Sequence, residues 1–133
     1  MLANPYRKYQ TTQISTASTG DLVVLLYDGA VQSLLLAEDA IEARRWAEST
    51  SELIRAQKII MELNNGIDLE RGGDLAVKLR GLYLYMYRIL VEASIEKDVA
   101  RVQHIRGLLD QLRASWRAVV KGEPIVQSSG AAA

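Results

Sequence analysis

The sequence predicts an all-α protein, an antiparallel up-down four-helix bundle with an N-terminal arm that has room for a short extra helix. Three observations support this fold class. The only prolines are Pro5 and Pro124, so no residue between them is barred from a helix interior. Apolar residues recur at steps of three and four in four separate stretches, which is typical of amphipathic helices. The pair Asn65-Gly66 has helical periodicity on both sides and does not indicate a β-hairpin.

The first helix is expected from Ser18 to about Ala43. Ser18 and Asp21 have the Ser-x-x-acid spacing of a capping box. The apolar residues of this helix that recur at helical spacing are Leu22, Leu25, Leu26, Ala30, Leu34, Ala37 and Ile41. Arg44 and Arg45 then form the expected turn. A second helix follows, and its apolar face consists of Trp46, Ser49, Leu53, Ala56, Ile60, Leu63 and Ile67.

The adjacent glycines Gly72-Gly73 predict a turn over residues 68–74, with Asp74 as the N-cap of the third helix. The apolar face of that helix consists of Leu75, Leu79, Leu82, Met86, Ile89 and Ala93. Asp98 is the expected N-cap of a fourth helix, whose face consists of Val102, Ile105, Leu109, Leu112, Trp116 and Val119. We therefore expect an arm at residues 1–17, a bundle at 18–122 and a flexible tail at 123–133, the end of which resembles a remnant of cloning.

Composition excludes several classes of function. The chain has no cysteine and a single histidine, His104, so a thiolate zinc site, a histidine-rich metal site and a di-iron bundle centre are not expected. Its 16 basic and 16 acidic residues give no net charge, which disfavours a nucleic-acid partner. No apolar run approaches the roughly 20 residues of a membrane span, so membrane insertion is not expected. We predict a protein without enzyme activity, cofactor or metal, with His104 on the surface.

The first helix has too little polar surface for an ordinary bundle helix. Its polar side chains form one narrow stripe, consisting of Asp21, Asp28, Gln32 and Asp39. A helix that packs against two neighbours needs an apolar arc of little more than about 100°. Either this helix is buried by three neighbours or a docked terminus, or it contributes to a groove for a partner's helix.

Apolar residues also lie off the core face of the second and third helices. Ile54 and Met61 are seven residues apart, and Tyr83 and Tyr87 are four apart and are followed by Val91. Each pair alone is explained as well by scattered surface hydrophobes or by tyrosines that complete the core. Together with the first helix, these residues favour an interaction surface.

The arm has an unusual composition for a frayed terminus. Tyr6 and Tyr9 are three residues apart and are followed by Ile14, and Asn4-Pro5 could open a helical turn. An arm of this kind could cover a hydrophobic groove, although a frayed end remains the alternative. Within the helices, Gly29, Gly81 and Gly107 indicate either close backbone approach or ordinary surface tolerance.

The neutral net charge conceals an asymmetry between the first and last helices. The first helix contains five acids and no base, namely Asp21, Asp28, Glu38, Asp39 and Glu42. The last contains six bases, Lys97, Arg101, Arg106, Arg113, Arg117 and Lys121, against Asp98 and Asp110. These two helices are neighbours in an up-down bundle, so we expect their exposed edges to form ion pairs.

Three motifs in one order make the sequence resemble the flagellar secretion chaperone FliS family. They are Asn4-Pro5-Tyr6 with Tyr9, then Thr16-Ala17-Ser18, then Leu26-Tyr27-Asp28-Gly29-Ala30. Supporting matches are Ala56-Gln57-Lys58-Ile59-Ile60, Glu62-Leu63, Gly72-Gly73, Leu79, Leu82, Tyr83, Tyr85, Met86 and Trp116, so that the resemblance spans residues 4–116. Thr19 stands where the family usually has proline, and Leu25 where it often has methionine.

This resemblance implies a cytoplasmic chaperone of the bacterial cell that binds the disordered C-terminal region of flagellin in hydrophobic grooves. It also implies that the chaperone prevents premature polymerisation and delivers its cargo to an export-gate component of the flagellar type III apparatus. Other flagellar regulators are further expected partners, and the protein is expected to be a monomer or a weak homodimer. By the same resemblance Tyr6 and Tyr9 act as a gate, and Tyr27, Asp28 and Gly29 belong to the signature of the first helix.

The residues predicted to form the cargo groove and its gate are Tyr6, Tyr9, Ile14, Leu22, Leu25, Tyr27, Asp28, Gly29, Ile54, Met61, Tyr83, Tyr87 and Val91. The alternative function is a generic helical adaptor or signalling bundle that binds another folded protein. A catalytic bundle is the third and weakest hypothesis.

Overall fold

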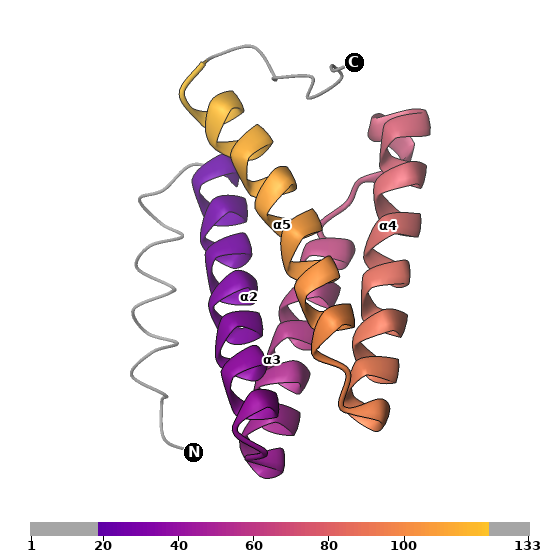
Figure 1. The fold of residues 1–133 in the computed structure, drawn as a ribbon. Coiled ribbons are helices and arrows are strands. Elements are labelled where there is room, and N and C mark those ends of the chain that lie inside the picture. The colour runs from indigo at the N-terminus through magenta and orange to yellow at the C-terminus, as the bar shows by residue number, and fades with distance from the viewer. Residues whose placement is uncertain (1–18, 123–133) are drawn as a thin grey trace, which may run out of the picture.

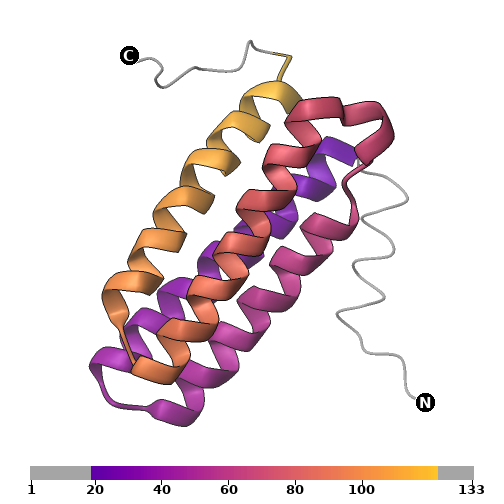
Figure 2. The ribbon, with the colours of Figure 1, turned by 90° about the vertical axis from the view of Figure 1, so that its right-hand side faces the viewer.

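Four helices account for most of the computed structural model, which describes residues 19–122. They are α2 (Thr19–Glu42), α3 (Trp46–Asn65), α4 (Leu69–Glu96) and α5 (Val99–Val120). Short turns reverse the chain after each helix, so successive helices run antiparallel (Figures 1 and 2). Each described helix packs against two others, in the ring α2–α3–α4–α5, and the most extensive interfaces are those of α2. The predicted all-α up-down bundle is confirmed, while Ser18, the arm and the tail lie outside the described residues.

The start of α4 differs from the prediction. Asp68, not Asp74, is the N-cap, and its carboxylate accepts hydrogen bonds from the backbone N–H groups of Glu70 and Arg71, both at 3.1 Å. The backbone of Asp68 is extended, which brings its side chain within reach of these two donors. Residues 69–74 belong to α4, and in place of the expected turn the helix has a local break at Gly73, where φ is 56° and ψ is −139°. Asp98 caps α5 as predicted, accepting from Ala100 N–H at 3.0 Å and from Arg101 N–H.

The core lies between the four helices and follows most of the predicted faces. On α3 the buried apolar residues are Leu53, Ala56, Ile60 and Leu63, and on α5 they include Val102, Ile105 and Leu109. The prediction was wrong for Leu75, which is 73% exposed, while Ala76, Tyr83 and Leu90 are buried. These three residues are spaced seven apart and therefore mark the side of α4 that faces the core. Leu75 is rotated around the helix by about 100° from that side.

The sequence was expected to contain no stretch apolar enough to span a membrane, and α2 is an exception to that expectation. By length and composition this helix could cross a membrane, since its most apolar window has a mean hydropathy of 1.4. One third of that window (33%) is buried inside the bundle, and the core helix of a soluble protein passes the same test. Because α2 packs against both α3 and α5, we assign it to the helical core.

Replacing Gly73 by alanine should lower the free energy of unfolding by about 1–3 kcal/mol. The left-handed φ of 56° at this position is strained for any residue with a Cβ atom. Gly81→Ala is the matched control on the same helix, because its added Cβ meets no atom within 4 Å and should stabilise the protein by about 0.5–1 kcal/mol. Urea denaturation measures both changes. Equal effects of the two variants would contradict the assigned break.

Candidate functional site

An apolar hollow lies between α3 and α4. Ile54 and Met61 of α3 and Tyr87 of α4 line one cavity of about 310 Å³. Ile54 is 44% exposed and Tyr87 38% exposed, so both present apolar surface to solvent. The structure thus brings together residues that the sequence placed on two separate helices.

Helical geometry explains why these side chains line a groove. Ile54 and Met61 each follow a core residue, Leu53 and Ile60, and so point to the side about 100° from the core. The cavity that they share with Tyr87 shows that this side of α3 faces α4. On α4, Leu84 and Val91 lie one turn before and after Tyr87 and are 42% and 37% exposed. We call the surface formed by Ile54, Met61, Leu84, Tyr87 and Val91 the α3–α4 groove.

Leu84 was not among the predicted site residues. Its signal was present in the sequence, because Leu84 and Val91 are seven residues apart, as Ile54 and Met61 are. The spacing alone did not reveal that Tyr87, which lies between Leu84 and Val91, shares a hollow with Ile54 and Met61.

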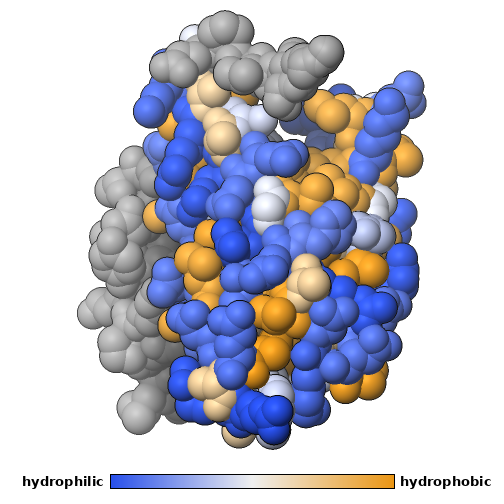
Figure 3. Space-filling view, in the orientation of Figure 1, coloured by the Kyte–Doolittle hydropathy of each residue, from blue (hydrophilic) through white to orange (hydrophobic). Residues whose placement is uncertain are grey.

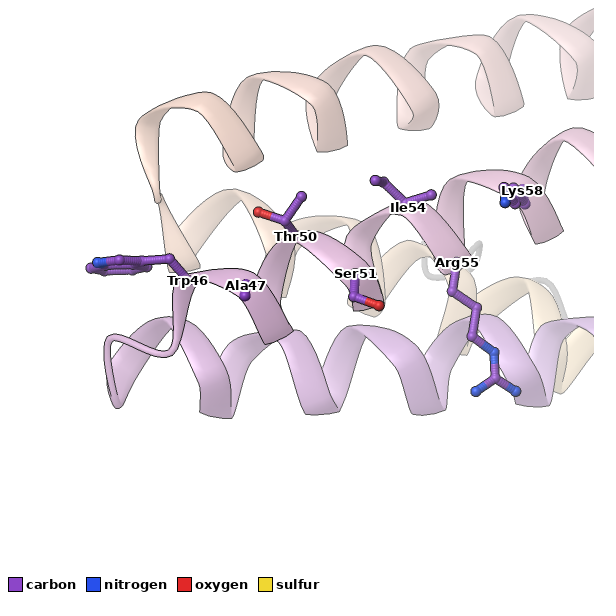
Figure 4. A pocket seen from close by; sticks show the side chains of 7 residues that line it. All are labelled: Trp46, Ala47, Thr50, Ser51, Ile54, Arg55 and Lys58. Carbon is purple, nitrogen blue, oxygen red and sulfur yellow. The ribbon is translucent and has the colours of Figure 1, made fainter.

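A second hollow of about 740 Å³ continues along α3 toward its start (Figure 4). Ile54 and Lys58 line both hollows, so the two lie next to each other along α3. Figure 4 shows Thr50 and Ile54 on one side of α3 and Arg55 on the other. At the start of the helix, Trp46 is 38% exposed, and the ammonium group of Lys97 lies 5.2 Å from its ring centroid. The hollow therefore joins an exposed aromatic residue to the α3–α4 groove.

A third cavity, of about 540 Å³, opens at the end of the bundle where α2 and α4 begin. Leu22, a predicted site residue, lines it together with Leu26, Leu79 and Trp116. In Figure 3 apolar side chains gather near this end, beside the start of α4. The described residues thus leave apolar surface uncovered at the point where the arm joins the bundle.

Two predicted site residues, Tyr27 and Tyr83, belong to the core. They are 0% and 2% exposed, and their hydroxyl groups form a hydrogen bond with each other. Burial raises the pKa of both hydroxyls above the usual value for tyrosine. In this structure neither offers a surface to a partner, although Tyr83 borders the end cavity. The alternative reading, tyrosines that complete the core, applies to Tyr83 and not to Tyr87.

Asp28 lies in an electrostatic seam between α2 and α5. Its carboxylate is 3.0 Å from the guanidinium groups of both Arg113 and Arg117, and Arg106 is 2.5 Å from Glu38. Glu38 raises the pKa of Arg106 through this hydrogen bond. The predicted ion pairing of the first and last helices is confirmed.

The remaining predicted residues of α2 have different surroundings. A Cβ atom on Gly29 would lie 3.2 Å from Cδ1 of Ile59, which shows close approach of α2 and α3, whereas Gly81 and Gly107 face open space. Leu25 is 45% exposed. Among the described helices, α2 packs closely along α3 and α5 and reaches α4 only through inward side chains such as Tyr27, so its outer side is not covered by a third helix. Tyr6, Tyr9 and Ile14 lie outside the described residues.

The described residues include no group of three or more metal-ligating side chains. His104 lies on the surface, where Nε2 is 3.1 Å from the hydroxyl oxygen of Tyr85. The site is therefore a set of apolar hollows suited to a peptide or protein surface.

The protein-family model described as "Flagellar protein FliS" matches residues 2–123. The flagellar secretion chaperone FliS of Bacillus subtilis is 35% identical over 92% of this chain and 90% of its own length. The protein of the same name from Salmonella typhimurium is 32% identical over 80% of this chain and 79% of its own length. The flagellar secretion chaperone FliSB of Pseudomonas aeruginosa is 34% identical over 80% of this chain and 85% of its own length.

Single substitution of Tyr27 or Tyr83 by phenylalanine should lower the free energy of unfolding by about 1–3 kcal/mol, because each removes the hydrogen bond between the two buried hydroxyl groups. The double variant should lose less than the sum of the two single losses, since both polar groups are then gone. Urea denaturation of the three variants measures this coupling. Additive losses would show that the two hydroxyls do not depend on each other.

Proposed function

The chain belongs to the FliS family of flagellar secretion chaperones, and from this premise we propose that it binds the C-terminal segment of flagellin in the hydrophobic hollows of its bundle. In this proposal the bound segment cannot polymerise prematurely, and the complex is delivered to an export-gate component of the flagellar type III apparatus. The proposed location is the bacterial cytosol, and other flagellar regulators are further proposed partners. The relatives are named as chaperones, which is a non-enzymatic role.

The observation that supports this proposal most directly is the α3–α4 groove. A disordered segment that folds on binding loses conformational entropy, which extended apolar contact must offset. Ile54 and Met61 are seven residues apart and therefore about 10 Å apart along α3, which matches two turns of a guest helix. The 38% exposure of Tyr87 adds an amphipathic aromatic contact on the facing helix.

The apolar surface of α2 that the described residues leave exposed, and the end cavity, add to this binding surface. Leu25, Leu35 and Leu36 are each at least 40% exposed on α2, and Leu22 and Trp116 line the end cavity. An extended segment could contact several of these hollows at once, whereas a single folded domain meets one face. The arm residues Tyr6, Tyr9 and Ile14 are proposed to compete with the guest for this surface.

The double variant Ile54→Ser/Met61→Ser should bind the flagellin C-terminal segment about five- to 150-fold more weakly in calorimetry. Loss of two partly exposed apolar contacts removes roughly 1–3 kcal/mol of binding free energy. Val119→Ser/Val120→Ser is the matched control, because these valines of α5 are 42% and 38% exposed and lie away from the groove. Circular dichroism must show that both variants remain folded. Unchanged affinity of the first variant would remove Ile54 and Met61 from the binding site.

Deletion of residues 1–12 should change either the affinity for the flagellin segment or its association rate. If the arm covers the groove and competes with the guest, its removal should raise the association rate. If the arm instead closes over the bound guest, its removal should raise the dissociation rate. Stopped-flow fluorescence of the deleted and full-length chains measures both rates. If neither rate changes, the gate is not part of the mechanism.

The same flagellin segment separates this proposal from a generic helical adaptor. A chaperone of the proposed kind should induce helix in the segment, and circular dichroism detects this as a more negative far-ultraviolet ellipticity of the mixture than of the separate components. A generic adaptor that binds a folded domain should leave the segment disordered.

Sedimentation of the chain at several protein concentrations tests the expectation that it is a monomer or a weak homodimer.

A further inference from the structure

The two helices that form the α3–α4 groove carry a charge pattern that their apolar residues do not explain. Between Leu75 and Val91, α4 has three bases and no acid. On α3, Lys58 lines the groove together with Ile54 and Met61.

Helical geometry separates the three bases of α4. Arg80 lies seven residues before Tyr87 and therefore on the same face, two turns along the groove. Lys78 is rotated by about 160° from Arg80 and lies on the opposite side of the helix. The guanidinium of Arg88 is 3.0 Å from Glu92 and lies 5.6 Å from the ring centroid of Tyr85, so it is already engaged. Of these three bases of α4, Arg80 is therefore the one that lies on the groove side and is not already paired.

Neither Lys58 nor Arg80 forms an ion pair with any residue between 19 and 122. Glu62 lines the same hollow as Lys58 but forms no ion pair with either cation. The α2–α5 interface differs, since its carboxylates and guanidinium groups pair across the helices at 2.5–3.0 Å. The α3–α4 groove therefore has one cation on each helix that no described carboxylate holds in an ion pair.

We propose that the α3–α4 groove selects an amphipathic helix whose apolar face is bordered by acidic residues, with Lys58 and Arg80 contacting its carboxylates from the two sides. This inference rests on the proposed function, because it specifies the chemistry of the segment that fills the groove. Lysine and arginine can lay their aliphatic stems against the guest while their charged ends reach its polar border. Such contacts orient the guest and raise its association rate more than its affinity.

Two synthetic peptides with the same apolar heptad face test the charge preference. One has glutamate and the other lysine at the positions that border this face, and fluorescence anisotropy measures binding to the full-length chain. The glutamate peptide should bind about tenfold more tightly at low salt, the size expected when two partly exposed ion pairs replace two repulsions. The preference should nearly vanish at about 1 M salt, where the screening length is about 3 Å.

Variants locate the preference on the protein. Lys58→Gln/Arg80→Gln should remove most of it, and Lys58→Glu/Arg80→Glu should reverse it. Lys78→Glu is the matched control, since it changes the same helix two residues away and should reduce the preference far less. Because all three side chains are exposed, the variants should keep the melting temperature of the parent chain.

The outcomes distinguish this inference from the proposed function. Equal binding of the two peptides, or an equal effect of Lys78→Glu, overturns the charge selection. The proposed function still holds in that case if the flagellin segment binds and Ile54→Ser/Met61→Ser weakens it. If neither peptide nor the flagellin segment binds, both proposals fail.

Discussion

The hydrogen bond between the hydroxyls of Tyr27 and Tyr83 constrains the rest of this bundle. Both groups lie in an apolar core, where an unpaired hydroxyl is costly, so α2 and α4 must be rotated until the two meet. They join helices that are opposite each other in the ring and have no close backbone contact of their own. With Tyr83 directed inward, the helical repeat leaves Leu84, Tyr87 and Val91 on an outer side of α4. The core pair therefore decides which side chains are left for a guest.

The four sides of the bundle are closed in different ways. Ion pairs connect α2 to α5, and Arg101 connects α5 to the end of α4. On the side of α2 and α3, the absence of a side chain at Gly29 allows Ile59 to approach closely. Between α3 and α4, the described residues form no ion pair, and exposed apolar side chains line the hollow. Among the described residues, the proposed binding side thus combines exposed apolar side chains with the absence of an ion pair between its two helices.

A chaperone for a disordered segment needs this combination of a rigid frame and an unsatisfied surface. In the proposed function the bound segment supplies the missing apolar contact and loses conformational entropy, so the bundle must not collapse to cover the groove itself. Buried leucines and isoleucines on all four helices provide that rigidity. The end cavity, which lies beside the break at Gly73, is a second apolar region that the described residues leave open.

The sequence by itself determined the helical class, the number of long helices, most of the core faces and the opposite charges of the first and last helices, because each depends on local spacing. The motifs around Tyr6, Ser18 and Tyr27 also indicated the family. Spacing could not decide whether Tyr83 or Tyr87 points inward, since residues four apart lie on nearly the same side of a helix. It also placed the cap of α4 six residues too late, because Asp68 and Asp74 are both good caps and only the folded backbone selects one. The meeting of Ile54 and Met61 with Tyr87 required the tertiary structure, which sets the rotation and offset of α3 against α4 through the packed core.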